Sequence, residues 1–538
     1  MMDMNVFSAT ARTMKLSFSL QEIALFTLLL AIIPLFLAIK YAKNKKNGKT
    51  PPPEAAGSWP IIGHLHLLGG AKRLLHRTFG SMADELGPIF SLRLGIHRAL
   101  VVSNWEVAKE CFTTNDKVFP TRPKSMAVKI MGYDHAMLGF VPYGQYWRDL
   151  RKLAVVELLS NRRLELLRHV RDTETNFFMK KLYQEAAKNG GHIVVEMKER
   201  FGDLAVNIIA KMISGKRYFS GSNAIKDEDS RQFCKAIKDF FYLAGLFLAS
   251  DSIPFLGWFY FVKGYVGEMK KTAKELDEVL ERWLKEHKEK RLKGVIKEEE
   301  QDFIHVMLSL MDEGEISAKE ADNIIKGTCL SLILGSNDTT VATLTWALSL
   351  LLNNPGILKK AQDELDIQVG KHQQVEEPHV KNLAYLQAIV KETLRLYPAT
   401  PVSVPREAME DCIIASFHIP AGTRLYLNLW KLHRDPSIWT NPLEFQPERF
   451  LNEHASLDVR GRDFEYLPFG SGRRMCPGVS FAVQVLSLTL ARLLHGFELM
   501  SVSDSPVDMS ESPGVICHKA TPLEVAFTPR LPFILYEG

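Results

Sequence analysis

The stretch that decides the fold is FGSGRRMCPG, which runs from Phe469 to Gly478 and contains one cysteine, Cys476. Its three glycines allow positive φ and a close approach of the backbone to a ligand. The apolar run 479–494 that follows predicts a helix, and the free N–H groups at its start favour a thiolate at Cys476. Arg474 adds a positive charge close by in the sequence. The segment therefore predicts a thiolate that is held in a rigid loop and gives one axial bond to a metal.

The composition excludes several other classes of protein. The chain has 538 residues, 46% hydrophobic and 24% charged, which is typical of a globular protein. Its net charge of +5 is too small to indicate a nucleic-acid partner. The six cysteines form no C-x-x-C pair, so we expect neither a zinc site nor a disulfide framework. The other five are Cys111, Cys234, Cys329, Cys412 and Cys517.

The N-terminal part predicts a membrane anchor. The 17 residues from Ile23 to Ile39 carry no charge, and lysines follow from Lys40 onward. An apolar helix flanked in this way spans a bilayer with the rest of the chain on the cytoplasmic side. We expect a lead over 1–15 (Met14 is an alternative start), an anchor over 16–40, a basic, Pro-rich linker over 41–63 and one large domain over 64–538. A cleaved signal peptide is the alternative.

Helical periodicity dominates the large domain. The spacing of Ser317 and Glu320 predicts a capped helix start, and Asn354-Pro355 predicts its end. This long helix is apolar nearly all round, apart from a polar notch at residues 335–340, so we expect it in a protein core rather than in a membrane. The charged segment 267–301 predicts a solvated face, and the aromatic segment 240–265 either core or a membrane-dipping surface. Short strands are predicted over Ile89–Leu94, Ala99–Ser103, Asp411–Ile414 and Leu523–Phe527.

The cysteine segment resembles the haem-binding loop of the cytochrome P450 family, F-x-x-G-x-R-x-C-x-G, at Phe469, Gly472, Arg474, Cys476 and Gly478. The resemblance implies a mostly α fold, a large helical prism with a small β portion after one N-terminal transmembrane helix. It also implies haem b with Cys476 as the iron ligand. Phe469 would pack near the porphyrin, and Arg474 would pair with a propionate.

Three further motifs are similar to those of the family and occur in the same order. Glu392 and Arg395 lie one helical turn apart, and Arg449 follows in a P-E-R-F segment. By resemblance these three form a buried structural network. Trp147 and Arg151 match W-x-x-x-R, and with Arg406 they would hold the haem propionates.

The notch resembles the family's oxygen-activating motif. Gly335, Asp338 and Thr339 share a helix face. The resemblance implies that Gly335 leaves room for dioxygen, that Thr339 hydrogen-bonds it and that Asp338 relays protons to it. Ser336 departs from the family's second glycine, and we expect it to narrow the groove or to bond back to the carbonyl four residues before it.

The resemblance also implies a partner, a location and a substrate class. Segments 59–66, 158–163 and 519–525 are similar to the plant A-type group, and we identify its family 82. We expect an NADPH-dependent monooxygenase of the endoplasmic reticulum membrane, single-pass with a cytosolic domain, supplied by NADPH-cytochrome P450 reductase. Its reductase-facing charges would be Arg148, Lys152 and Arg473. Substrate contacts are expected from Phe241, Leu334, Gly335, Val402 and Val515.

The expected reaction is oxidation of a small apolar plant metabolite, with a terpenoid or flavonoid favoured. An alkaloid or coumarin oxidase is the first alternative. The second alternative is a haem-thiolate isomerase or dehydratase that needs no reductase, although the presence of Asp338 and Thr339 disfavours it. A non-catalytic membrane scaffold is the third. No nucleic acid is expected among the partners, which are membrane lipid, reductase, substrate and dioxygen.

Overall fold

The computed structural model describes residues 50–68, 73–218, 228–245, 264–294, 302–312 and 318–537. By its internal contacts the chain divides into a unit of residues 1–51 with 416–418 and a unit of all other residues. In the first unit, the Thr50 carbonyl accepts a hydrogen bond from the backbone N–H of His418 at 2.7 Å. The predicted lead, anchor and linker up to residue 49, the helix cap at Ser317 and residues 246–263 of the aromatic segment lie outside the described residues.

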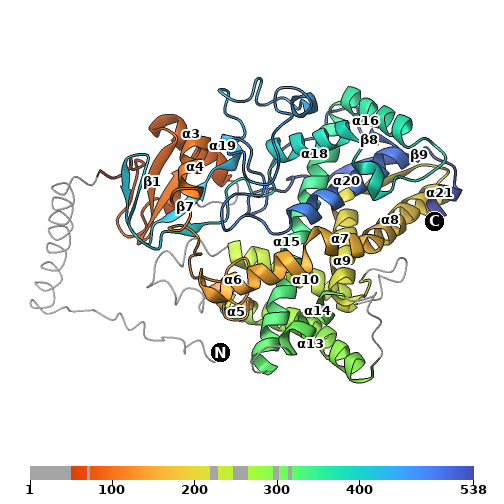
Figure 1. Ribbon diagram of the computed structural model, residues 1–538. Helices are drawn as coiled ribbons and strands as arrows, with labels where there is room; N and C mark the ends of the chain where they lie inside the picture. The colour runs from red at the N-terminus through yellow and green to blue at the C-terminus, as the bar shows by residue number, and fades with distance from the viewer. Residues whose placement is uncertain are drawn as a thin grey trace, which may run out of the picture. The chain divides into compact units, whose positions relative to one another are not determined.

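The second unit is mostly helical, as the sequence predicts (Figure 1). Its helices before residue 315 are α2 (Leu65–Leu68), α3 (Leu75–Leu86), α4 (Trp105–Phe112), α5 (Met126–Met131), α6 (Gln145–Lys152), α7 (Asn161–Leu166), α8 (Arg168–Lys188), α9 (Met197–Ser214), α10 (Glu228–Gly245), α13 (Tyr265–Leu292) and α14 (Phe303–Asp312). Those after it are α15 (Ala318–Leu352), α16 (Pro355–Gln368), α17 (Glu377–Val380), α18 (Ala384–Leu396), α19 (Leu429–Leu432), α20 (Val479–Gly496) and α21 (Ile534–Glu537). A π-helical turn, η1 (Leu153–Leu158), and a 3-10 turn, η5 (Pro447–Phe450), complete the helical part.

The strands form small sheets, and the four predicted strands are present as β1 (Ile89–Leu94), β2 (His97–Val102), β5 (Cys412–Ile414) and β9 (Glu524–Pro529). The largest sheet has the order β1 (Ile89–Leu94), β2 (His97–Val102), β7 (Arg424–Leu427), β4 (Arg406–Glu407). A second sheet has the order β3 (Ile193–Glu196), β9 (Glu524–Pro529), β8 (Phe497–Ser501). The remaining strands are β5 (Cys412–Ile414) and β6 (Phe417–Ile419). In the two larger sheets, neighbouring strands are antiparallel except β2 and β7, which run parallel with Ala99 opposite Arg424.

The long helix α15 has the position that its apolar character predicts. It spans 35 residues and ends two residues before Asn354-Pro355. It packs against α9, α13, α18 and α20, and Figure 1 shows it among these helices. Because its side chains are buried on nearly every face, its stability comes from tertiary packing, as is typical of a core helix.

The helix α20 follows the cysteine segment and is likewise part of the core. Among the described helices, α20 is long and apolar enough to cross a membrane. The helices α15 and α16 pass the same test only if they are taken together as one broken span, with a bend of 107° between them. Most of α20 is buried against other helices. Residues 267–292 of the charged segment lie in α13, where Lys271 and Lys274 have side chains 71% and 77% exposed, as predicted; its residues 295–301 lie outside the described residues.

Candidate active site

Cys476 lies three residues before α20, in a loop that its own backbone holds closed. Its N–H donates to the Phe469 carbonyl at 3.0 Å. Gly472 has φ +66°, and a Cβ there would lie 2.3 Å from Oδ1 of Asp116, so this position needs glycine. Burial raises the pKa of the Cys476 thiol, whereas the Gly478 N–H and the charge of Arg151 act against that rise. The loop therefore presents a half-buried thiol that a bound metal ion would deprotonate.

Arg406 lies beside this loop with part of its hydrogen-bonding capacity unused. It is 4% exposed, and its Nη2 donates to the Ser471 carbonyl at 2.6 Å. Its Nη1 is buried without a partner among the described residues. Burial lowers its pKa to about 10, and Asp116 opposes this effect. A buried guanidinium with a free donor indicates a missing anion.

The buried Arg474 and the half-buried Arg122 add two more positive charges. Arg474 donates to the carbonyls of Pro120 and Val141, each at 2.5 Å, and burial lowers its pKa to about 9. Arg122 donates to the Val404 carbonyl at 2.6 Å. Burial, then the charges of Arg406 and Arg474, lower its pKa well below the usual value. Arg122 belongs to no motif, so the sequence alone does not mark it as a site residue.

These charges are not balanced by carboxylates of the described residues. Asp116 is the carboxylate whose charge acts most strongly on Arg406, but it already forms an ion pair with Arg473 at 3.1 Å. Charges taken out of water are stable only when paired. A ligand with two carboxylates and a metal that accepts a thiolate satisfies both observations, and haem is such a ligand.

The motif at α6 lies against the same loop. Trp147 is buried, and the guanidinium carbon of Arg474 lies 4.5 Å from the centre of its ring. Burial lowers the pKa of Arg151, and the charge of Cys476 acts against that fall. The structure thus brings together Trp147, Arg151, Arg474 and Cys476 from two distant segments.

Glu392, Arg395 and Arg449 form one buried ion network. The Nε and Nη2 atoms of Arg395 donate to the two Glu392 oxygens at 2.7 and 2.8 Å. The Nε of Arg449 donates to Glu392 Oε1 at 3.3 Å. The side chains are 0–1% exposed. Further Arg395 donors bind the carbonyls of His433 and Pro442, so the network joins α18 to the segment after α19.

The polar notch of α15 is open at Gly335. This residue is exposed, and a Cβ there would meet no atom within 4 Å. The Thr339 hydroxyl donates to the Gly335 carbonyl at 2.8 Å. The Ser336 hydroxyl donates to the Ile333 carbonyl at 3.3 Å, three residues before it rather than the expected four. Asp338 lies 3.3 Å from Nε2 of His518, a residue that the sequence analysis did not predict.

The expected substrate residues differ in exposure. Leu334 is buried, whereas Val515 is 45% exposed. Phe241 on α10 is partly exposed and packs against the core. Val402 is also partly exposed and packs against the cluster around Phe79 and Tyr426.

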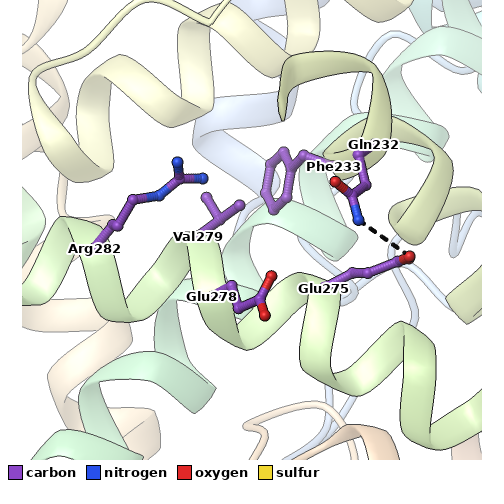
Figure 2. Close-up of a pocket in the computed structure, with 6 residues that line it drawn as sticks. All are labelled: Gln232, Phe233, Glu275, Glu278, Val279 and Arg282. Atoms are coloured by element: carbon purple, nitrogen blue, oxygen red, sulfur yellow. Dashed lines mark hydrogen bonds between the residues drawn. The ribbon is translucent and has the colours of Figure 1, made fainter. Parts of the chain in front are cut away.

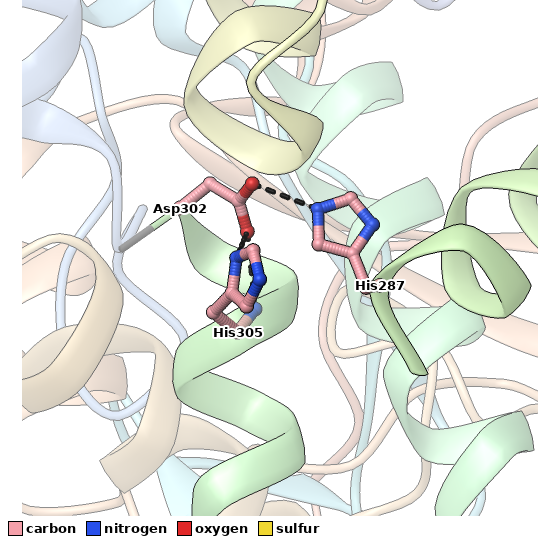
Figure 3. A group of neighbouring side chains, drawn as sticks. All are labelled: His287, Asp302 and His305. Atoms are coloured by element: carbon pink, nitrogen blue, oxygen red, sulfur yellow. Dashed lines mark hydrogen bonds and ion pairs between the residues drawn. The ribbon is translucent and has the colours of Figure 1, made fainter. Parts of the chain in front are cut away.

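Two other features lie outside this group of residues. A cavity of about 310 Å³ lies between α10 and α13, lined by Gln232, Phe233, Glu275, Glu278, Val279 and Arg282 (Figure 2). Asp302 bonds His287 of α13 at 2.8 Å and His305 of α14 at 2.9 Å (Figure 3). Both contacts have hydrogen-bond lengths. The Asp302 carboxylate also accepts a hydrogen bond from the backbone N–H of His305, so these three side chains connect α14 with α13.

The comparisons with known proteins agree with this site. Residues 51–527 match the family model described as cytochrome P450. Strychnine-10-hydroxylase of Strychnos nux-vomica is 54% identical over 95% of this chain and 98% of its own length. Xanthotoxin 5-hydroxylase CYP82C4 of Arabidopsis thaliana is 52% identical over 95% and 99%. Flavonoid-6-hydroxylase of Ocimum basilicum is 51% identical over 92% and 94%.

A solved structure supports the fold. A zebra fish cytochrome P450 with progesterone has a TM-score of 0.70 at 24% identity and covers 84% of this chain and 99% of its own. The family implies a cysteine-ligated haem and electrons from a reductase, which the Cys476 loop and the buried arginines fit. The chain belongs to the cytochrome P450 family, in plant family 82, and is a monooxygenase.

Proposed function

We propose that the protein is an anchored monooxygenase that hydroxylates a small, ring-containing plant specialised metabolite. The observation that carries this proposal is the full-length similarity, above 50% identity, to enzymes named as hydroxylases of strychnine, xanthotoxin and a flavonoid. An alkaloid, a coumarin and a flavonoid are supported equally. The terpenoid expectation gains no support from these three names.

The chain's own residues have defined tasks in this reaction. Haem supplies the activation of dioxygen, with the overall balance RH + O2 + 2 e− + 2 H+ giving ROH + H2O. Cys476 would hold the iron, and Arg406 with its free Nη1 would hold a propionate. Thr339 would turn its hydroxyl from the Gly335 carbonyl to donate a hydrogen bond to dioxygen, and Asp338 would deliver the protons that the reaction consumes. The exposed Gly335 leaves the space in which dioxygen and substrate meet.

A reconstitution experiment tests the proposed activity. The full chain, with NADPH and a plant reductase in microsomes, is given strychnine, xanthotoxin, a flavone and a terpenoid. We expect a hydroxylated product from at least one of the first three, and none without NADPH. Cys476→Ser is the matched control and should lose both the product and the carbon monoxide difference spectrum of a thiolate haem. Product formation without NADPH would favour the isomerase, and no product despite an intact spectrum would contradict the proposal.

We further propose that residues 16–40 anchor the protein in the endoplasmic reticulum membrane with a cytosolic domain. The uncharged run followed by lysines supports this topology. Protease treatment of sealed microsomes should digest the large domain completely. Protection of that domain inside the vesicles would contradict the topology.

The reductase is proposed to dock near α6. Arg148 and Lys152 are exposed on this helix, which lies against the Cys476 loop, whereas Arg473 is held by Asp116. Opposite charges on two proteins accelerate their association. Replacing Arg148 and Lys152 by glutamate should raise the reductase concentration needed for half-maximal turnover, most strongly at low salt. An unchanged concentration would refute this docking site.

A further inference from the structure

The segment 511–519 between β8 and β9, called here the C-terminal strap, is fixed against α15. The indole N–H of Trp346 on α15 donates to the Cys517 carbonyl at 2.7 Å. The Cys517 N–H donates to the Ala399 carbonyl at 2.8 Å. Trp346 is fully buried and stacks on Tyr397, with ring centres 4.0 Å apart. The residue after Cys517 is therefore held beside α15.

The other end of the strap is anchored as firmly. Glu511 is 8% exposed and accepts hydrogen bonds from Arg77 at 2.8 Å and from His76 at 3.2 Å. It forms a β-bridge with Lys519, and it also accepts a contact from the Cys517 thiol at 3.5 Å. Both ends of the strap are thus tied to buried parts of the domain, so the side chains between them have defined positions.

His518 uses this fixed position to meet the notch of α15. Its Nε2 lies 3.3 Å from Oδ2 of Asp338, and the two side chains are 17% and 19% exposed. Its carbonyl accepts a hydrogen bond from the Ser512 N–H at 2.8 Å, which holds the backbone in place. Asp338 is the neighbour of Thr339 in the chain. The imidazole therefore contacts the Asp338 carboxylate, and both side chains are partly open to solvent.

We propose that His518 is a positioning residue that orients the Asp338 carboxylate and supplies it with protons from solvent. The proposal rests on the monooxygenase reaction described above, which consumes two protons for each product molecule. An imidazole takes up a proton at one ring nitrogen and releases one from the other, so it returns to its starting state without an oxidant or a reductant. A positioned group of this kind contributes to proton transfer at neutral pH.

The first test compares two sources of oxidising equivalents. His518→Gln keeps an N–H donor in reach of Asp338 but cannot carry a proton. Hydrogen peroxide brings its own protons, so turnover with peroxide needs none from solvent. With xanthotoxin as the probe, His518→Gln should lower the reductase-supported rate at least about tenfold and leave the peroxide-supported rate within about twofold. The exposed His372 provides the matched control His372→Gln, which should change neither rate.

A second measurement needs no organic substrate. The C–O stretching band of the reduced carbon monoxide complex reports charge and hydrogen bonding beside the bound gas. His518→Gln should shift this band in the wild-type background and add no shift in Asp338→Asn, because His518 acts through Asp338. An equal shift in both backgrounds, or none, would overturn the proposal.

The two measurements separate the possible failures. Equal losses of the reductase-supported and peroxide-supported rates would give His518 a merely structural role and refute the proposal. No loss in either rate would refute it as well. If the wild type does not turn over xanthotoxin, the substrate class fails for that compound, and the band shift still decides the role of His518. His518→Asn replaces His518→Gln should the latter fail to bind haem.

Discussion

Replacing Glu392 by glutamine should destabilise the haem-side core strongly, although the side chain keeps its shape. The carboxylate is 0% exposed and accepts bonds from Arg395 at 2.7 and 2.8 Å and from Arg449 at 3.3 Å. It also accepts the Gln446 N–H at 3.0 Å. Glutamine has one acceptor oxygen, turns its amide group toward donors and leaves two buried guanidiniums without a counter-charge.

Removing one member of a buried ion pair costs about 3–5 kcal/mol. A typical domain is stable by about 5–15 kcal/mol, so this one change removes a large share of the total. The expected result is a marked fall in the denaturant midpoint and in the fraction of purified protein that binds haem. The effect on stability should exceed any effect on the turnover rate of the haem-loaded fraction, because Glu392, Arg395 and Arg449 all lie outside the polar notch.

The assay pairs denaturant unfolding with the carbon monoxide difference spectrum per mole of protein. Glu278→Gln is the matched control, since Glu278 forms an i,i+4 pair with Lys274 and its side chain is 58% exposed. Exposed pairs of this kind contribute little to stability. A Glu392→Gln protein with the midpoint and haem content of Glu278→Gln would refute the reasoning that the network is a set of mutually dependent buried charges.

Three further changes have defined outcomes. Arg406→Leu should speed haem loss to an acceptor protein at least about tenfold, because a charge-assisted bond to a propionate is worth about 1.5–3 kcal/mol; an unchanged loss rate would contradict that contact. Burial raises the pKa of Glu511, but bonds from His76 and Arg77 outweigh burial and lower it to about 2. Its stabilisation is therefore complete above pH 4.5 and lost as the pH falls toward 2, so Glu511→Gln should flatten the stability profile there; an unaltered profile would exclude this role. Asp302→Asn should lower the unfolding midpoint, since the hydrogen bond to His287 loses its charge; an unchanged midpoint would show that the group does not stabilise the contact of α13 with α14.

Features set by neighbours in the chain could be predicted from the sequence. The strand Ile89–Leu94 has the predicted bounds, because its alternation of apolar and polar residues is a local property. The pairing of Glu392 with Arg395 follows from their spacing on a helix. The same holds for the position of Cys476 before α20, since the apolar run and the glycines are adjacent in the chain.

Features that depend on contacts between distant parts of the chain could not be predicted from the sequence. Arg122 gains its role from Val404, Arg406 and Arg474, which lie about 280 to 350 residues later. His518 meets Asp338 across about 180 residues. The thiol shows the same limit, since burial by distant elements raises the pKa of Cys476, whereas the local helix start alone would lower it.

The parallel pairing of β2 with β7 has a consequence during synthesis. Leu427 lies opposite Val102, so the edge of β2 stays open until about 325 more residues have been made. At about 5–20 residues per second, a ribosome needs roughly 16–65 s for that stretch. Throughout this interval the nascent chain exposes the unpaired edge of an apolar strand, which is a template for aggregation. The open edge of β2 is therefore protected only when β7 has been made and pairs with it.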